Sequence, residues 1–187
     1  MYLSIYVVME TVTILDKTFR ISISSAKIVE RIKQLADEIN HDLKNKEVVF
    51  VGILNGAFMF ASDLLKFITI PCCISFLKFS SYVGTQASGD VKQLIGINDD
   101  LKDKTVVIIE DIVESGNTLN TAIQLLKENN PAEIKVAGLL LKPDSYKYNH
   151  RIDYIGFTIP NDFVIGYGLD YNGYGRNLND IFTVIDL

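Results

Sequence analysis

Two adjacent carboxylates, Glu110 and Asp111, follow a run of four β-branched apolar residues at 106–109. Such a run is typical of a strand that is buried on both faces, as in a parallel sheet. Open α/β sheets bind their ligands beyond the C-terminal ends of the strands. Because two neighbouring carboxylates repel each other and add nothing to packing, the pair favours a ligand-binding role over a structural one.

A short polar turn follows the acidic pair and precedes a helical pattern at residues 119–127. The turn consists of Ser115, Gly116, Asn117 and Thr118. Backbone N–H groups and hydroxyls at the start of a helix bind anions, and the helix dipole assists them. We therefore interpret residues 106–118 as a sugar-phosphate site, with carboxylates for hydroxyls or a metal ion and a turn for the phosphate. The alternative is an ordinary connection to a capped helix, because Ser, Thr, Asp and Asn are common helix caps.

The length and charge of the chain limit the classes of function. A chain of 187 residues suits one domain, or a core domain with a small subdomain. The net charge of −5 argues against non-specific nucleic-acid binding, which needs a basic surface. No apolar stretch approaches the roughly 20 residues that span a bilayer, and residues 1–10 lack the basic segment of a signal peptide. We therefore expect no nucleic-acid or membrane partner and a cytoplasmic location.

The two cysteines, Cys72 and Cys73, are adjacent and lie in an apolar run. This context is typical of buried thiols in a reducing compartment and differs from a disulfide framework or a metal site. We therefore expect both thiols to be buried.

Strand-like and helix-like segments alternate along the chain. The segments with strand character are 2–21, 48–54, 72–79, 91–97, 105–110, 134–142, 152–159 and 163–165. The segments with helical character are 24–45, 56–67 and 117–129. This alternation predicts βαβ units and a mostly parallel sheet. The glycine-rich signatures of dinucleotide enzymes and of P-loop proteins are absent from the sequence, which argues against both classes.

Residues 106–118 resemble the phosphoribosyl pyrophosphate (PRPP) motif of the type I phosphoribosyltransferases, and their details are most similar to the hypoxanthine-guanine branch. Matches to this family extend from about Val48 to Asp180. The resemblance implies an α/β fold, in which a mostly parallel twisted sheet is flanked by helices and carries a small hood subdomain. The chain, residues 1–187, would then be one domain, with a core of about 25–150 and a hood of about 1–24 and 151–187.

For the PRPP motif, the resemblance implies that Glu110 and Asp111 hold the ribose hydroxyls, directly or through Mg²⁺. Ser115, Gly116, Asn117 and Thr118 would bind the 5′-phosphate. Glu114 stands where the branch usually has an Asp that faces N7 of the purine, and it would act as the catalytic base as N9 attacks the anomeric carbon. Glu is one methylene longer than Asp, so its carboxylate must fold back or the base must sit further out. The structural alternative is a carboxylate that is favourable at a helix N-terminus.

Leu54, Asn55 and Gly56 resemble the family's pyrophosphate-binding loop, whose strained and often cis peptide presents an N–H group. Many relatives have a basic residue where this chain has Asn55, so the loop would depend more on its backbone. Arg176 would also contact pyrophosphate. The alternative is that Asn-Gly is simply a common turn dipeptide.

The purine-binding residues that the resemblance implies are Lys142, Phe163, Val164 and Asp170. Lys142 would donate to O6 of a 6-oxopurine, and Phe163 would stack on the base. The Val164 backbone would contact the purine edge. Asp170 would reach the exocyclic position or Mg²⁺, which makes Glu110, Asp111 and Asp170 the expected metal ligands. The alternatives are a solvated Lys and an aromatic segment that only packs.

Ser81 and Tyr82 lie near the start of a polar segment, 79–89, which resembles the family's flexible catalytic loop. Such a loop excludes water from a reactive intermediate. An ordinary surface loop is the alternative interpretation.

The implied function is purine salvage, in which the 5-phosphoribosyl group passes from PRPP to N9 of hypoxanthine or guanine. The cofactor would be Mg²⁺, since oxygen ligands suit it and no His/Cys cluster is visible. Two alternatives remain open: a non-catalytic regulator that senses PRPP, and a xanthine-preferring enzyme. The resemblance also implies a homodimer or homotetramer.

Overall fold

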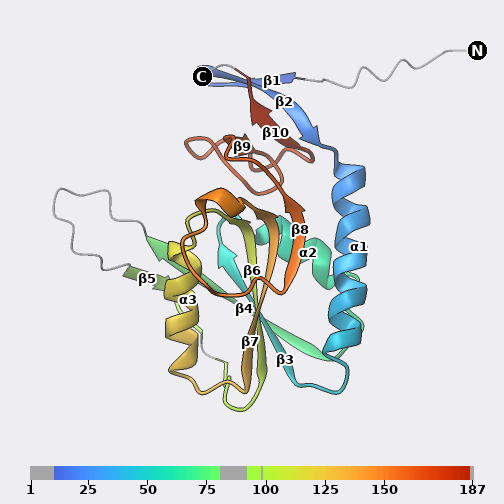
Figure 1. The fold of residues 1–187 in the computed structure, drawn as a ribbon, viewed down its shortest axis with the longest axis vertical. Coiled ribbons are helices and arrows are strands. Elements are labelled where there is room, and N and C mark those ends of the chain that lie inside the picture. The colour runs from blue at the N-terminus through green and yellow to red at the C-terminus, as the bar shows by residue number, and fades with distance from the viewer. Residues whose placement is uncertain (1–10, 81–91, 98, 186–187) are drawn as a thin grey trace, which may run out of the picture.

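The computed structural model describes residues 11–80, 92–97 and 99–185, and its larger sheet has six strands in the order β5-β4-β3-β6-β7-β8. Five of these strands are parallel, and β5 pairs antiparallel with β4 (Figure 1). The strands are β3 (Val48–Leu54), β4 (Cys72–Ser80), β5 (Lys92–Ile95), β6 (Thr105–Val113), β7 (Glu133–Leu141) and β8 (Tyr154–Thr158). The predicted mostly parallel α/β fold is therefore confirmed.

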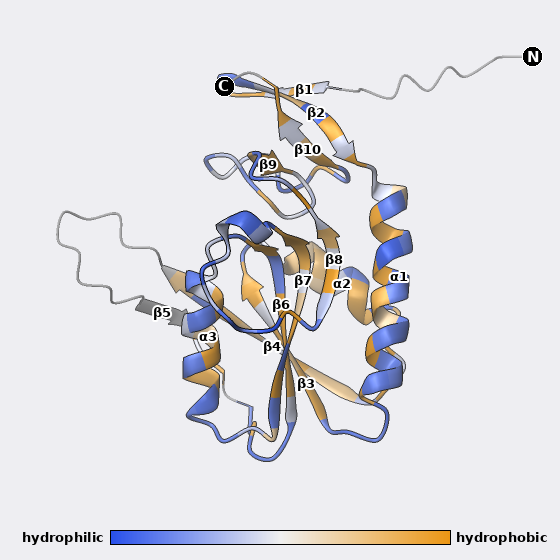
Figure 2. Ribbon diagram, viewed as in Figure 1, coloured by the Kyte–Doolittle hydropathy of each residue, from blue (hydrophilic) through white to orange (hydrophobic). Residues whose placement is uncertain are grey.

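Three helices cover the two faces of this sheet. They are α1 (Ser25–Asp42), α2 (Phe58–Leu65) and α3 (Asn117–Lys127). Alternate strand residues point to opposite faces, so Val107 and Ile109 pack with α1 and α2 while Val106 and Ile108 pack with α3. The central strands are accordingly apolar along most of their length (Figure 2). None of the helices in the described part of the chain is long and apolar enough to cross a membrane.

A second, antiparallel sheet has four strands in the order β1-β2-β10-β9. Its strands are β1 (Thr11–Ile14), β2 (Lys17–Ile23), β9 (Val164–Ile165) and β10 (Ile181–Val184). Phe19, Ile165 and Phe182 form its own small apolar core. The small sheet lies beyond the end of the large sheet at which β8 terminates (Figure 1). Strand β10 is absent from the sequence prediction, because its four residues depend on pairing with the distant strand β2.

Strand β6 is longer than the segment 105–110 predicts. Ile112 and Val113 continue the ladder by pairing with Leu140 and Leu141 of β7. The acidic pair therefore lies within the last part of the strand and not beyond its end. This position fixes both carboxylates through the sheet, which a loop would not do.

The prediction that Cys72 and Cys73 are buried is wrong, because both side chains are exposed. The reason is the short reach of β5, which pairs with β4 only at its far end, at Lys78, Phe79 and Ser80. The start of β4 consequently has a neighbouring strand on one side only. The predicted loop residues Ser81 and Tyr82, and the predicted strand within residues 1–10, lie outside the described residues.

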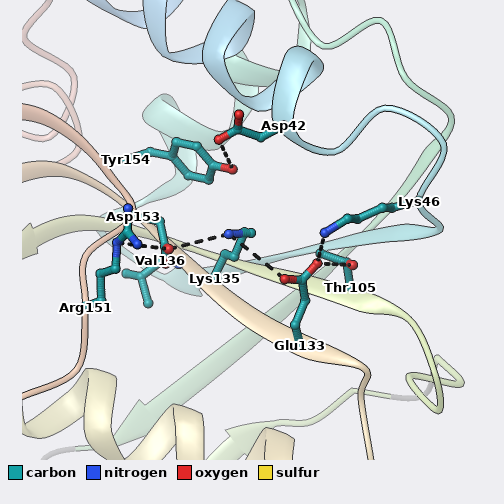
Figure 3. A network of polar contacts seen from close by, with 9 residues as sticks. All are labelled: Asp42, Lys46, Thr105, Glu133, Lys135, Val136, Arg151, Asp153 and Tyr154. Atoms are coloured by element: carbon teal, nitrogen blue, oxygen red, sulfur yellow. Dashed lines mark hydrogen bonds and ion pairs between the residues drawn. The ribbon is translucent and has the colours of Figure 1, made fainter.

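A polar network connects the beginnings of β6, β7 and β8 (Figure 3), at the end of the large sheet opposite the small sheet (Figure 1). Glu133 accepts a hydrogen bond of 2.8 Å from the Thr105 hydroxyl and pairs with Lys46. Asp153 accepts a 3.0 Å bond from the Val136 backbone N–H. Because partly exposed ion pairs contribute little free energy each, we interpret the network as fixing the strand starts more than as a source of stability.

Candidate active site

Strands β3 and β6 end in a cavity of about 460 Å³. Its lining residues come from both strand ends, from the end of β4 and from the start of α3. They are Ile53, Leu54, Gly56, Phe79, Glu110, Asp111, Ser115, Asn117 and Thr118. The cavity therefore brings the predicted acidic pair, part of the predicted phosphate turn and part of the predicted 54–56 loop to one place.

Glu110 is the most buried acidic group in this cavity, with an exposed fraction of 7%. Its Oε2 is a buried side-chain oxygen without a hydrogen-bond partner among the described residues. Burial, with the neighbouring Asp111 charge, raises the pKa of Glu110 well above its ordinary value. A buried polar atom without a partner costs free energy, and folds keep such atoms where they serve binding or catalysis. The oxygen is suited to a sugar hydroxyl or a hard cation.

Asp111 is partly exposed to the cavity and stands directly against the backbone of Gly56. A Cβ on residue 56 would lie 1.6 Å from Asp111 Oδ2, so only glycine fits there. Burial raises the pKa of Asp111 to about 6; the Asp170 carboxylate acts in the same direction, and the Arg176 guanidinium opposes it. The carboxylate thus changes its charge near neutral pH, in contact with the 54–56 loop.

The small sheet is joined to the 54–56 loop through Gly168. Its φ is +100°, and a Cβ there would lie 2.1 Å from the Gly56 carbonyl oxygen. The Leu54–Asn55 peptide is cis, as the resemblance of this loop implied it could be. Tyr167 Oη also donates to Asp63 Oδ2 of α2 at 2.5 Å. These contacts hold the connection after β9 directly above the ends of the parallel strands.

Arg176 forms two strong contacts within the same connection. Its Nη1 donates to the Gly168 carbonyl oxygen at 2.6 Å, and its Nη2 lies 2.6 Å from Asp170 Oδ1. The Arg176 side chain is about 29% exposed, so part of it faces solvent. Asp170 is also held by the Gly173 N–H, which donates to Oδ2 at 2.7 Å. A charged guanidinium fixed in this way is suited to a polyanion that approaches the 54–56 loop.

The predicted phosphate turn begins α3. Gly116 has a φ of +81° and precedes the helix, and the Tyr146 ring would lie 2.4 Å from a Cβ at this position. Residues 110–119 line a second, smaller cavity of about 260 Å³. The first N–H groups of a helix have no partner within the helix, so the first turn of α3 can present N–H groups to an anion, together with the Ser115 and Thr118 hydroxyls. Within this turn, the Asn117 N–H donates to Ser115 Oγ at 3.4 Å and the Asn120 N–H to the Gly116 carbonyl oxygen at 2.8 Å.

Lys142 and Glu114 meet at the ends of neighbouring strands. The Lys142 ammonium lies 3.3 Å from Glu114 Oε1, and the Lys142 backbone N–H donates to the Val113 carbonyl oxygen at 3.0 Å. Lys142 is buried, with an exposed fraction of 3%, whereas the Glu114 side chain is 54% exposed. The pair therefore places a positively charged donor and a negatively charged acceptor side by side, next to the phosphate turn.

Val164 belongs to β9 of the small sheet, and Phe163 directly precedes it. Phe163 is 41% exposed and makes an edge contact with Tyr171, with ring centroids 5.7 Å apart. Val164 is buried and lines a separate cavity between the small sheet and residues 159–162. Neither of these two predicted purine residues lines the cavity that holds the acidic pair.

Sequence reasoning missed the aromatic residues that follow Lys142. Tyr146 and Tyr148 pack against Gly116, and the Tyr148 hydroxyl donates to Asn117 Oδ1 at 3.0 Å. The available signal was the pattern of two tyrosines and a histidine within the six residues 145–150. The three rings stand at alternate positions, 146, 148 and 150, which is the period of a strand, but this period alone gave no reason to place the rings on α3.

The described residues offer a partial metal site. No group of three or more His, Cys, Asp or Glu side chains in the described ranges is arranged to hold one ion. The predicted set of Glu110, Asp111 and Asp170 does not form such a group, and the two Asp170 oxygens contact Arg176 and the Gly173 N–H. Mg²⁺, however, is commonly held by one or two carboxylates plus substrate phosphates and water. The unpaired Glu110 oxygen and the Asp111 carboxylate fit that arrangement.

Comparison with known proteins gives a consistent result. The family model of the phosphoribosyl transferase domain matches residues 23–172. The hypoxanthine-guanine phosphoribosyltransferase of Sus scrofa is 36% identical over 182 residues, which is 91% of this chain and 81% of the relative. The hypoxanthine phosphoribosyltransferase of Buchnera aphidicola is 37% identical, with 90% and 97% covered. A crystal structure of a hypoxanthine-guanine phosphoribosyltransferase from Bacillus anthracis superposes with a TM-score of 0.82 at 36% identity, over 89% of this chain and 96% of that one.

Proposed function

The chain belongs to the phosphoribosyltransferase family, and from this premise we propose how its residues carry out the reaction. The protein is an enzyme of purine salvage. It transfers the 5-phosphoribosyl group from PRPP to N9 of a 6-oxopurine, hypoxanthine or guanine, and releases pyrophosphate with IMP or GMP. The residue roles, the identity of the metal and the assembly below are proposals.

Glu110 and Asp111 hold the ribose hydroxyls, and Ser115 to Thr118 hold the 5′-phosphate. The observation that supports this assignment most strongly is the cavity that the acidic pair and the phosphate turn share. Its carboxylates lie within β6 and its turn begins α3, so the distance between them is set by one rigid connection. A sugar phosphate needs both kinds of group at the two ends of a pentose, which a general anion site does not supply.

The family requires a metal ion for PRPP binding, and Mg²⁺ is the cation we propose. Glu110 and Asp111 would hold it together with substrate oxygens, since the unpaired Glu110 Oε2 lies in the same cavity. Bound Mg²⁺ neutralises the charge that develops on departing pyrophosphate. Asp170 acts indirectly, because its carboxylate fixes Arg176 by the 2.6 Å contact.

Pyrophosphate leaves between the 54–56 loop and Arg176. Gly56 allows the loop backbone to approach Asp111 closely. Gly168 lies against the Gly56 carbonyl oxygen and accepts a hydrogen bond from Arg176, so it links the loop to Arg176. Backbone donors and a fixed guanidinium stabilise a developing polyanion. Asn55 adds no charge. Among the described residues that we assign to this subsite, the positive charge therefore comes from Arg176.

The base lies between the two sheets, with Phe163 and Val164 above it. Lys142 donates to O6, and Glu114 accepts the proton at N7 as N9 forms its bond to the anomeric carbon. The 3.3 Å contact supports this pairing, because O6 and N7 of a purine are neighbours and need a donor and an acceptor side by side. Adenine carries a donor at the same place and would meet the Lys142 ammonium unfavourably.

An assay of hypoxanthine, guanine, xanthine and adenine with PRPP and Mg²⁺ tests the function. We expect turnover of hypoxanthine and guanine, loss of turnover with a chelator, and recovery when Mg²⁺ is added back. Preferred turnover of xanthine would support the xanthine-specific alternative. PRPP binding without turnover of any base would support the non-catalytic regulator.

We also propose that the small antiparallel sheet acts as the hood over the base, and that the enzyme is a cytoplasmic homodimer or homotetramer. The contacts of Gly168 and Tyr167 with the large sheet support the role of the hood. Family resemblance alone supports the assembly and the location. Light scattering of the purified protein distinguishes two subunits from four, and cell fractionation tests the location.

A further inference from the structure

The segment 145–150 lies across the start of α3 and contacts Ser115, Gly116, Asn117 and Asn120. The backbone N–H of Lys147 donates to the Ser115 carbonyl oxygen at 3.3 Å. The rings of Tyr146 and Tyr148 approach Gly116, where a Cβ would lie 2.4 and 3.0 Å from them. His150 Nε2 is 2.8 Å from Asn120 Oδ1. A segment that follows Lys142 is thus packed on the turn that follows Glu114.

Within this segment, Tyr148 makes the side-chain contact to the phosphate turn. Its hydroxyl donates to Oδ1 of Asn117 at 3.0 Å, and Asn117 lines both cavities of the site. The Tyr148 ring is itself stacked on His150, with centroids 6.0 Å apart and planes 12° apart. The Tyr148 ring, and with it the hydroxyl, is therefore held in place by this stacking.

The direction of this hydrogen bond determines what Asn117 offers to a ligand. An amide has an acceptor oxygen at one end and a donor NH₂ group at the other. Because the Tyr148 hydroxyl donates to Oδ1, the acceptor end of the amide is turned toward Tyr148 and the NH₂ group lies on the other side of the amide. A phosphate attracts the NH₂ group and repels the carbonyl oxygen, so an amide free to rotate would spend part of its time in the unfavourable orientation.

We propose that Tyr148 is a positioning residue for the 5′-phosphate, which holds the Asn117 amide so that its NH₂ group faces the sugar phosphate. The inference rests on the proposed function, in which residues 115–118 bind the 5′-phosphate. Tyr148 acts through Asn117 and does not touch the reacting atoms. The two parts of the Tyr148 side chain act differently: the ring packs on Gly116, and the hydroxyl orients the Asn117 amide.

The test combines Tyr148→Phe, Asn117→Ala and the double variant, because Tyr148→Phe removes the hydroxyl and keeps the ring. We expect Tyr148→Phe to raise KM for PRPP and Kd for ribose 5-phosphate by about two- to tenfold, the effect of one neutral hydrogen bond. The maximal rate and KM for hypoxanthine should change by less than about twofold. Asn117→Ala should have a similar effect, and the double variant should resemble Asn117→Ala alone, because the two residues act as one unit.

Tyr154→Phe is the matched control, since the Tyr154 hydroxyl bonds Asp42 at 3.3 Å in the network away from the phosphate turn. It should lower thermal stability without changing KM for PRPP. The inference is overturned if Tyr148→Phe leaves both constants unchanged, if the effects of Tyr148→Phe and Asn117→Ala multiply, or if Tyr154→Phe raises KM equally. Calorimetry with ribose 5-phosphate tests the role of Tyr148 without requiring turnover. If the wild-type protein transferred the phosphoribosyl group to no purine, that result would reject the proposed function but not the role of Tyr148 in phosphate binding.

Discussion

The ammonium of Lys142 lies 3.3 Å from the carboxylate of Glu114, although Lys142 is buried and Glu114 is exposed. The two residues follow Leu141 and Val113, which pair in the ladder between β7 and β6. Parallel register therefore places the proposed donor for O6 and the proposed acceptor for N7 next to each other. The longer side chain of Glu, compared with the Asp usual in this branch, reaches the ammonium across the gap between strands.

Replacing Lys142 by Met should remove recognition of 6-oxopurines while keeping the buried aliphatic stem. We expect kcat/KM for hypoxanthine and guanine to fall by about 10²-fold, since a charged hydrogen bond contributes roughly 1.5–3 kcal/mol. KM for PRPP should stay within about threefold of the wild-type value, because Lys142 does not line the cavity that holds the acidic pair. Steady-state kinetics with each base measures both effects. A weak adenine activity that falls in the same proportion would contradict a specific role at O6.

Replacing Glu114 by Gln should lower turnover without weakening PRPP binding. A general base contributes about 10²–10⁴-fold to a rate, and Gln keeps the size of Glu but cannot accept the proton. Glu114→Asp is the matched variant, because it retains the charge and shortens the reach. We expect Glu114→Asp to keep turnover within about tenfold of wild type. Single-turnover kinetics separates this chemical step from product release, and an unchanged rate in Glu114→Gln would remove Glu114 as the base.

The parts of the site that depend on local pattern could be predicted from the sequence. The apolar run before Glu110 indicates a buried strand, and the polar turn at 115–118 indicates a helix start; both are properties of neighbouring residues. Family resemblance added the role of the 54–56 loop. The fold class followed from the alternation of strands and helices, and the described structure confirms it.

The rest depended on contacts between distant segments. The meeting of Lys142 with Glu114 follows from the register of two strands, and the register is set by the whole sheet. Strand β10 lies between β2 and β9 and depends on pairing with both, and β2 is far away in the sequence. Cys72 is exposed because β5 pairs with β4 only at the far end of β4. The residues next to Cys72 in the sequence do not predict where this pairing stops.

Replacing Gly56 by Ala should disrupt the pyrophosphate subsite, because the added Cβ would lie 1.6 Å from Asp111 Oδ2. Either the loop or the carboxylate must move, so we expect KM for PRPP to rise by at least about tenfold, the equivalent of 1.4 kcal/mol. Gly173→Ala is the control for strain alone: its φ of +87° makes Ala strained, no atom lies within 4 Å of the new Cβ, and Ala keeps the backbone N–H that donates to Asp170 Oδ2. Equal effects of both substitutions on KM would attribute the loss to general strain. PRPP titration by calorimetry gives the affinities directly.

Replacing Asp111 by Asn should stabilise the free protein while removing PRPP binding. Burial raises the pKa of Asp111 to about 6 in the folded chain, above the value of about 3.9 for an Asp in an unfolded chain. Between these pH values the folded state binds more protons than the unfolded state, so the contribution of Asp111 to the free energy of unfolding falls as pH rises from about 4 to 6. Asn carries no such titration.

Urea unfolding of both proteins without ligand tests this linkage. The gain in free energy of unfolding from Asp111→Asn should be smallest near pH 4, grow through pH 6 and level off above about pH 7, where we expect about 1–2 kcal/mol after allowing for solvent screening. In the wild-type enzyme, KM for PRPP should fall as pH rises through about 6, because the ionised carboxylate binds the metal and the ribose hydroxyls. A difference in stability that does not vary with pH would show that Asp111 is not held at a raised pKa, and it would remove the charge change at Asp111 as the cause of any pH dependence of PRPP binding.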